Sequence, residues 1–242
     1  MTDGLLLLHA WPLDARMWEA QIAHVAVATS APNLPGFGGA PAAGDVMTMT
    51  AAAEHAIRSL DEAGIERAVV CGLSLGGYVA FEVWRQVRER VVGLVLANTR
   101  AVADPPEAVE ARRALAERLR SEGNVLATEP PPLLAEDAPD DLQSRVREWI
   151  AEQPAESIAA AALGMAERPD STPDLAAIDV PTLVITSSGD RLIAPDVSKE
   201  MGAAIPGARV EVIDGVGHLS NVEAPDAFGH LLVEHLEVCG LS

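Results

Sequence analysis

A serine in a glycine-rich turn is the strongest chemical feature of the sequence. Residues 72–76 read Gly-Leu-Ser-Leu-Gly, after the apolar pair Val69 and Val70 and before a helical pattern of apolar residues. This order predicts a strand, a tight turn and a helix, with glycines that leave room for a strained turn presenting the serine hydroxyl. The amide of Leu75, at the start of the helix, would point to where an oxyanion develops. Ser74 is therefore the candidate nucleophile and Leu75 a candidate oxyanion donor.

A serine nucleophile needs a base that accepts its proton. His218 is the candidate, because it ends the flexible stretch Asp-Gly-Val-Gly-His at residues 214–218, directly after an expected strand. His9 also follows a strand, but we expect it to shape its loop, since His218 supplies the base. The remaining histidines fall within expected helices, where packed or solvated roles are favoured: His24, His55, His230 and His235.

The base needs an acid that holds its tautomer, and this acid should also follow a strand. Asp190 meets the requirement, because the apolar residues 182–186 run into Ser-Ser-Gly-Asp, and Asp190 lies between Ser74 and His218 in the chain. A turn aspartate ahead of a helix is the alternative interpretation. Asp104, a few residues past the preceding strand, is the reserve candidate for the acid.

The loop after the first expected strand should hold the second oxyanion donor. Residues 9–12 read His-Ala-Trp-Pro, and the backbone amide of Trp11 is the expected donor. The ring of Trp11 either walls the substrate pocket or has a simple packing role.

Apolar runs alternate with helical patterns along most of the chain, and Thr50 is the expected N-cap of one of the helices. This alternation predicts an α/β fold, with a mostly parallel sheet of about six core strands flanked by helices. Besides the run that leads to Ser74, strands are expected at residues 5–8, 25–31, 91–97, 181–186 and 208–213.

The alternation stops between residues 99 and 177, where the pattern is almost entirely helical. We expect a core made of residues 1–98 and 178–242, with residues 99–177 inserted as a helical lid over the carboxyl ends of the strands. Trp149 is the only aromatic residue of this insertion, so a modest, largely aliphatic substrate pocket is expected, with Trp149 in its lining. The insertion's helices are expected at residues 107–121, 140–151 and 156–167.

The composition limits the possible partners. Lys and Arg number 17 against 36 Asp and Glu, a formal charge of −19 that disfavours nucleic acid and membrane surfaces. No pattern typical of a metal site, a P-loop or a dinucleotide site is present, so no cofactor is expected. The first residues have no basic stretch and an apolar run of only four, and Cys71 falls in a buried strand, so a soluble, cytoplasmic protein with a reduced thiol is expected. The oligomeric state cannot be read from these patterns.

Taken in order, these motifs resemble the alpha/beta-hydrolase superfamily over nearly the whole chain. The resemblance implies that fold and assigns the nucleophile, acid and base to Ser74, Asp190 and His218. Ala10 and Asn33 replace a common glycine and aspartate of the family, and neither transfers a proton. The matching stretches are residues 9–12, 33–38, 72–76, 189–190 and 217–218.

Within this superfamily, residues 72–77, 96–99 and 218–223 look like the branch of 3-oxoadipate enol-lactonases and small arylesterases. The turn at Pro35 lacks the arginine usual in enol-lactonases, and the insertion lacks their Arg-Trp-Phe stretch. Haloalkane dehalogenases and epoxide hydrolases are disfavoured, because they form an alkyl ester on an aspartate where this chain has Ser74.

The expected activity is hydrolysis of a small or medium carboxylic ester or lactone through an acyl-enzyme. Carbon–carbon bond hydrolysis or cofactor-free peracid formation at the same site is the alternative. A binding protein that keeps the fold without turnover is a third possibility, disfavoured by the intact set of three residues.

Overall fold

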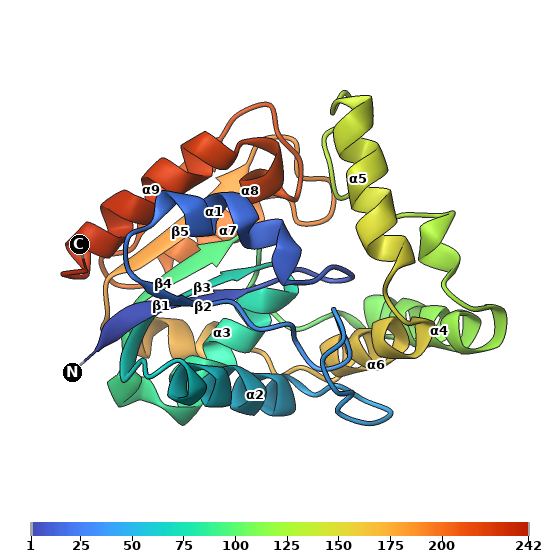
Figure 1. Ribbon diagram of the computed structural model, residues 1–242, viewed down its shortest axis with the longest axis horizontal. Coiled ribbons are helices and arrows are strands. Elements are labelled where there is room, and N and C mark those ends of the chain that lie inside the picture. Colours follow the sequence, from blue (N-terminus) through green and yellow to red (C-terminus); the bar gives the residue numbers. More distant parts are fainter. Residues whose placement is uncertain (1, 242) are drawn as a thin grey trace.

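The computed structural model describes residues 2–241, and within them one parallel sheet of six strands organises the chain (Figure 1). The strand order is β2-β1-β3-β4-β5-β6, with every neighbouring pair parallel. The α/β fold with about six parallel core strands is thus confirmed. The strands are β1 (Asp3–Leu8), β2 (Ala28–Ser30), β3 (Arg67–Leu73), β4 (Val91–Ala97), β5 (Thr182–Ser187) and β6 (Arg209–Ile213).

Helices cover both faces of this sheet, which explains why the central strands read as continuous apolar runs. From Leu5 to Leu8 and from Ala68 to Leu73 every residue is buried. Figure 1 shows α2 (Met49–Glu62) and α3 (Leu75–Gln86) on one face, and α1 (Glu19–His24) and α9 (Pro225–Val238) on the other. Two further helices of this part of the chain are α7 (Pro195–Ala203) and α8 (Ser220–Glu223).

The start of α2 corrects one expectation. Its N-cap is Thr48, whose side chain accepts a hydrogen bond from the Ala51 amide at 3.1 Å. Thr50 lies inside the first turn, and its hydroxyl donates to Glu82 instead. Both threonines precede an apolar helical pattern, and only the backbone geometry distinguishes them.

Between β4 and β5 the chain forms helices only. They are α4 (Pro106–Glu122), α5 (Asp140–Ala151) and α6 (Ala155–Ala166), with short 3-10 helices at Val125–Ala127 and Thr172–Ala177. Helix α4 packs against α6, and Figure 1 shows the three long helices beyond the carboxyl ends of the strands. The division of the chain at residues 98 and 178 and the role of the inserted segment as a lid stay predictions.

No helix within residues 2–241 is both long enough and apolar enough to cross a membrane.

Candidate active site

Ser74 occupies the turn between β3 and α3 in a backbone conformation that is costly for a side chain. Its φ is 58° and its ψ is −114°, a strained region that persists only where the surroundings enforce it. Two glycines make the turn possible. A Cβ on Gly72 would collide with the carbonyl of Gly76, and a Cβ on Gly76 would collide with the carbonyl of Leu8. The Gly-Leu-Ser-Leu-Gly pattern is therefore a packing requirement of this turn.

Hydrogen bonds with the end of β4 and with Thr99, just after it, hold the turn in place. The Ser74 amide donates to the Ala97 carbonyl at 2.9 Å, and the Thr99 hydroxyl donates to the Ser74 carbonyl at 2.9 Å. Leu75 is the first residue of α3, so its amide has no carbonyl one turn earlier in the helix to bond. This amide is available to an anion beside Ser74.

His218 and Asp190 lie side by side at the carboxyl ends of β6 and β5. The Nδ1 of His218 is 2.8 Å from Oδ2 of Asp190, and both side chains are buried. The other carboxylate oxygen of Asp190 accepts the amides of Leu192 and Ile193 at 2.9 and 3.0 Å. Burial alone would raise the pKa of Asp190, but hydrogen bonding and charge from His218, with the Ile193 amide and Asn98, leave it below its ordinary value. Asp190 is therefore a carboxylate at neutral pH, and it favours the proton on Nδ1 of His218.

Asn98, at the end of β4, connects these groups. Its side-chain amide donates to Asp190 at 3.0 Å and to the Ser187 hydroxyl at 2.7 Å, and its oxygen accepts the Ser220 hydroxyl at 2.6 Å. Ser187 in turn donates to the carbonyl of Gly217, beside His218. Asn98 has a φ of 43° and is fully buried. The sequence showed this residue only as part of a family-like motif, because its partners come from two distant stretches, residues 187–190 and Ser220.

We expect Asn98→Ala to raise the pH at which the protein unfolds on acidification. Removing the donor raises the folded-state pKa of Asp190 toward its ordinary value, so stability from the ionised carboxylate is lost at a higher pH on acidification. A loss of about 2 kcal/mol is also expected at pH 7, since a hydrogen bond to a charged group is broken. Urea unfolding at pH 7 and from pH 5 to 3 measures both effects. Ser220→Ala keeps the Asn98 amide that donates to Asp190, so it should unfold at the same acidic pH as the wild type. An equal shift of this pH in both variants contradicts the prediction.

A cavity of about 120 Å³ brings Ser74 and His218 together. Within residues 2–241 no hydrogen bond joins the Ser74 hydroxyl to His218, a separation common in sites without substrate. The ring of Trp11 forms part of the wall, held by a hydrogen bond from its Nε1 to the Ile158 carbonyl at 3.1 Å. The lining residues are Trp11, Ser74, Tyr78, Arg100, Arg112, Pro131, Met165, Leu192, Ile193 and His218.

Trp149 does not line this cavity, which corrects the expectation that it forms part of the substrate pocket. It lies on α5 at a separate hollow of about 190 Å³ that also includes Met17 and Pro225, with the Arg145 guanidinium 5.6 Å from its ring centre. The rotation of α5 directs the ring toward the side of the molecule where α1 and α9 lie. Tyr78, on α3, is the aromatic residue that accompanies Trp11 in the cavity, and its place directly after the turn was the signal that could have identified it.

His9 and Asp104 take positions that leave the proton-transfer roles to other residues. His9 is fully buried, with Nδ1 2.9 Å from the Ala10 carbonyl and Nε2 accepting the Leu34 amide at 2.9 Å. Burial lowers the pKa of His9 to about 4, so it is neutral and shapes the loop as expected. Asp104 bonds arginines rather than His218.

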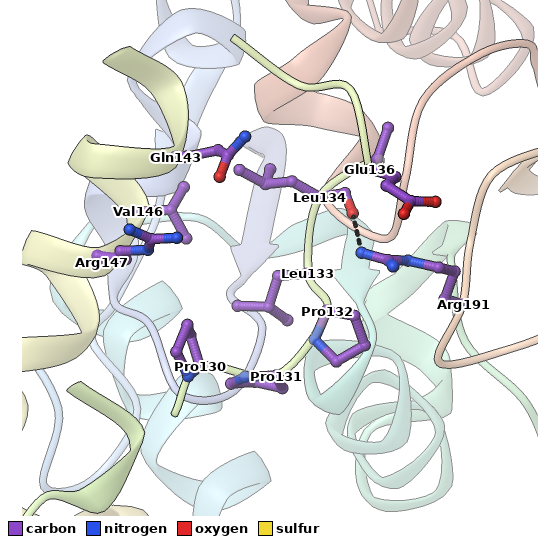
Figure 2. Close-up of a pocket in the computed structure, with 11 residues that line it drawn as sticks. Pro130, Pro131, Pro132, Leu133, Leu134, Glu136, Gln143, Val146, Arg147 and Arg191 are labelled. Atoms are coloured by element: carbon purple, nitrogen blue, oxygen red, sulfur yellow. Dashed lines mark hydrogen bonds between the residues drawn. The ribbon is translucent and has the colours of Figure 1, made fainter. Parts of the chain in front are cut away.

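A second cavity, of about 260 Å³, lies on the other side of Pro131, which borders both (Figure 2). Its wall is the segment 130–136, and Figure 2 shows Arg191 donating to the Leu134 carbonyl, at 3.3 Å. Val146 and Arg147 of α5 face this segment from the opposite side.

Glu223, on α8, connects the segment 130–136 to the loop that holds His218. Its carboxylate accepts the amides of Ala135 at 2.9 Å and Gly217 at 2.8 Å. Burial raises the pKa of Glu223, although both amides oppose the shift. The insertion thereby helps to position His218, a role for Glu223 that no local pattern in the sequence indicated.

With this geometry in view, the chain can be placed in a family. The model of the alpha/beta hydrolase family matches residues 5–230, and the chain belongs to this family. Among residues 2–241, no group of three or more His, Cys, Asp and Glu side chains is placed to hold a metal ion.

Individual relatives show which hydrolases the chain is similar to. A thermophilic esterase from Thermogutta terrifontis, solved with malate bound, is 39% identical, with a TM-score of 0.94 over 99% of this chain and 90% of that one. The epoxide hydrolase EphH of Mycobacterium tuberculosis is 30% identical over 80% of this chain and 97% of its own length. A 3-oxoadipate enol-lactonase of Acinetobacter baylyi is 29% identical over 72% of this chain, and the match spans 65% of that enzyme. The resemblance to hydrolases with esterase and lactonase members is confirmed.

Proposed function

We propose that this protein is a serine hydrolase of small or medium carboxylic esters or lactones. The observation that carries the proposal is the shared cavity of Ser74 and His218, with His218 bonded at 2.8 Å to a buried, ionised Asp190. The similarity to an esterase at 39% identity supports the same class of substrate.

The geometry suggests a mechanism through an acyl-enzyme. His218 takes the proton of Ser74 as the serine oxygen attacks the substrate carbonyl, and Asp190 stabilises the imidazolium that forms. The amides of Leu75 and Trp11 hold the negative charge on the former carbonyl oxygen. His218 then protonates the leaving alkoxide, and a water molecule deprotonated by His218 releases the acid and restores Ser74.

Three other reactions are alternatives to this proposal. Epoxide opening, the activity named for the Mycobacterium tuberculosis relative, is disfavoured because a serine cannot form the alkyl-ester intermediate that an aspartate forms. Carbon–carbon bond hydrolysis and peracid formation could use the same three residues. Rates of ester hydrolysis, diketone cleavage and peroxide-dependent bromination, measured side by side, separate them. A cytoplasmic location and a small-molecule partner stay predictions.

A fluorophosphonate probe tests the nucleophile directly. The folded protein should displace fluoride and form a phosphonate ester on Ser74, which mass spectrometry of the labelled peptide detects. Denatured protein and Ser74→Ala should remain unlabelled, because labelling needs His218 as base and the oxyanion donors in place. Failure of the folded protein to react favours a binding protein on this fold. A label on another serine would show that this other serine, and not Ser74, is the nucleophile.

A further inference from the structure

Three arginines surround a single carboxylate beside the catalytic cavity. Asp104, whose side chain is fully covered, bonds Arg112 at 2.6 Å and Arg168 at 2.9 Å, and it also bonds Arg100. Burial would raise the pKa of Asp104, but Arg112 and Arg168 outweigh it and leave that pKa below its ordinary value. The cluster therefore holds three positive charges and one negative charge at neutral pH.

Several N–H groups of these three arginines have no hydrogen-bond partner among residues 2–241. The Nε of Arg100 is buried without a partner, as is the Nε of Arg168. Arg112 uses only its Nε, toward Asp104, and within residues 2–241 no hydrogen bond engages its two terminal nitrogens. The terminal nitrogens of Arg168 have other partners: they donate to the carbonyls of Met165 and Val102, and the guanidinium carbon lies 4.2 Å from the ring centre of Tyr78.

Arg100 and Arg112 both line the cavity that contains Ser74 and His218, although they come from different elements. Arg100 follows the end of β4, and Arg112 lies on α4 of the insertion. The walls nearby are apolar, formed by Pro131, Met165, Leu192 and Ile193. An excess of positive charge here is unexpected for a chain with a formal charge of −19, whose surface as a whole repels anions.

We infer that Arg100 and Arg112 form a carboxylate-binding subsite of the catalytic cavity, and that the substrate is a short ester or lactone carrying a carboxylate group. A planar guanidinium can bind a carboxylate through two parallel hydrogen bonds. Arg100 and Arg112 already bind the carboxylate of Asp104, so their side chains are oriented to bind such a group. Arg168 is a positioning residue, because it fixes Asp104 and the Tyr78 ring. The inference rests on the proposed ester hydrolysis at Ser74.

Matched pairs of anionic and neutral esters test the subsite. Monoethyl glutarate against ethyl pentanoate carries the charge on the acyl side, and 4-acetoxybutanoate against butyl acetate carries it on the alcohol side. In one of the two pairs the wild-type kcat/KM should favour the anionic ester by about 10-fold or more, since a hydrogen bond to a charged group contributes about 1.5–3 kcal/mol. The preference should shrink as salt is added. A ratio at or below one in both pairs overturns the inference.

The arginine variants are compared by the ratio of kcat/KM for the anionic ester to kcat/KM for the neutral ester. Arg112→Gln and Arg100→Gln should each bring the anionic-to-neutral ratio toward one while neutral esters are still hydrolysed, and Arg112→Lys should restore part of it. Arg113→Gln, on the exposed face of the same helix, should keep the wild-type ratio. An unchanged ratio in Arg112→Gln and Arg100→Gln shows a purely structural cluster and overturns the inference. Absence of fluorophosphonate labelling and of turnover for every ester instead contradicts the proposed function.

Discussion

Ser74→Ala should lower kcat for a short activated ester by about 10⁴ or more, while binding of the substrate changes little. The expected size follows from the loss of the covalent route, which leaves only binding and the oxyanion donors to assist water. The variant should fold, because the Ser74 hydroxyl makes no hydrogen bond to the protein within residues 2–241. Hydrolysis of 4-nitrophenyl butyrate, followed with purified variant at high concentration, measures the residual rate.

A matched control separates chemistry from folding. Ser121→Ala removes an exposed hydroxyl on α4 that, among the described residues, bonds only carbonyls of its own helix, and it should retain the wild-type rate. Thermal unfolding of Ser74→Ala should show a Tm close to or above that of the wild type, because alanine at φ 58° carries a similar backbone cost. A Ser74→Ala variant with wild-type turnover would remove Ser74 from the reaction.

The reliable predictions from the sequence were those that depend on neighbouring residues. The alternation of apolar runs and helical patterns predicted the parallel sheet, and the insertion's helices lie within about two residues of their expected ends. Ser74, Asp190 and His218 each follow a strand, and parallel strands bring their carboxyl ends to one edge. The order of these residues along the chain was therefore enough to predict that they lie together.

What could not be predicted depends on contacts between distant segments. Trp149 on α5 lies away from the cavity, at a hollow that it shares with Met17 and Pro225 from the two ends of the chain. Asn98 acts through Asp190, 92 positions away, and Glu223 joins the nearby Gly217 to Ala135, 88 positions away. Asp104 is the clearest case: its place after a strand made it a reserve acid, but the arginines that surround it come from the end of β4, from α4 and from the segment after α6.

Asp190→Asn should reduce kcat by about 10⁴, with a smaller change in KM, because it reverses the tautomer of His218. In the wild type both carboxylate oxygens accept N–H donors: Leu192 and Ile193 amides on one, and His218 and Asn98 on the other. The NH₂ of an asparagine must replace one of these oxygens. Facing the two backbone amides it would break two bonds, so it should face His218, which then accepts at Nδ1 and carries its proton on Nε2.

With the proton on Nε2, His218 cannot take the proton of Ser74. The ¹⁵N chemical shifts of the His218 ring should show the exchanged tautomer at neutral pH, and kcat should recover partly as hydroxide replaces the base at high pH. Asp196→Asn is the control, since Asp196 is exposed at the start of α7 and pairs with Lys199 alone among residues 2–241, and its turnover should stay within about twofold of the wild type. Asp104→Asn is not a suitable control, because it would leave the buried Arg168 without its counter-charge. Wild-type turnover in Asp190→Asn, or an unchanged His218 tautomer, would show that another group orients the base.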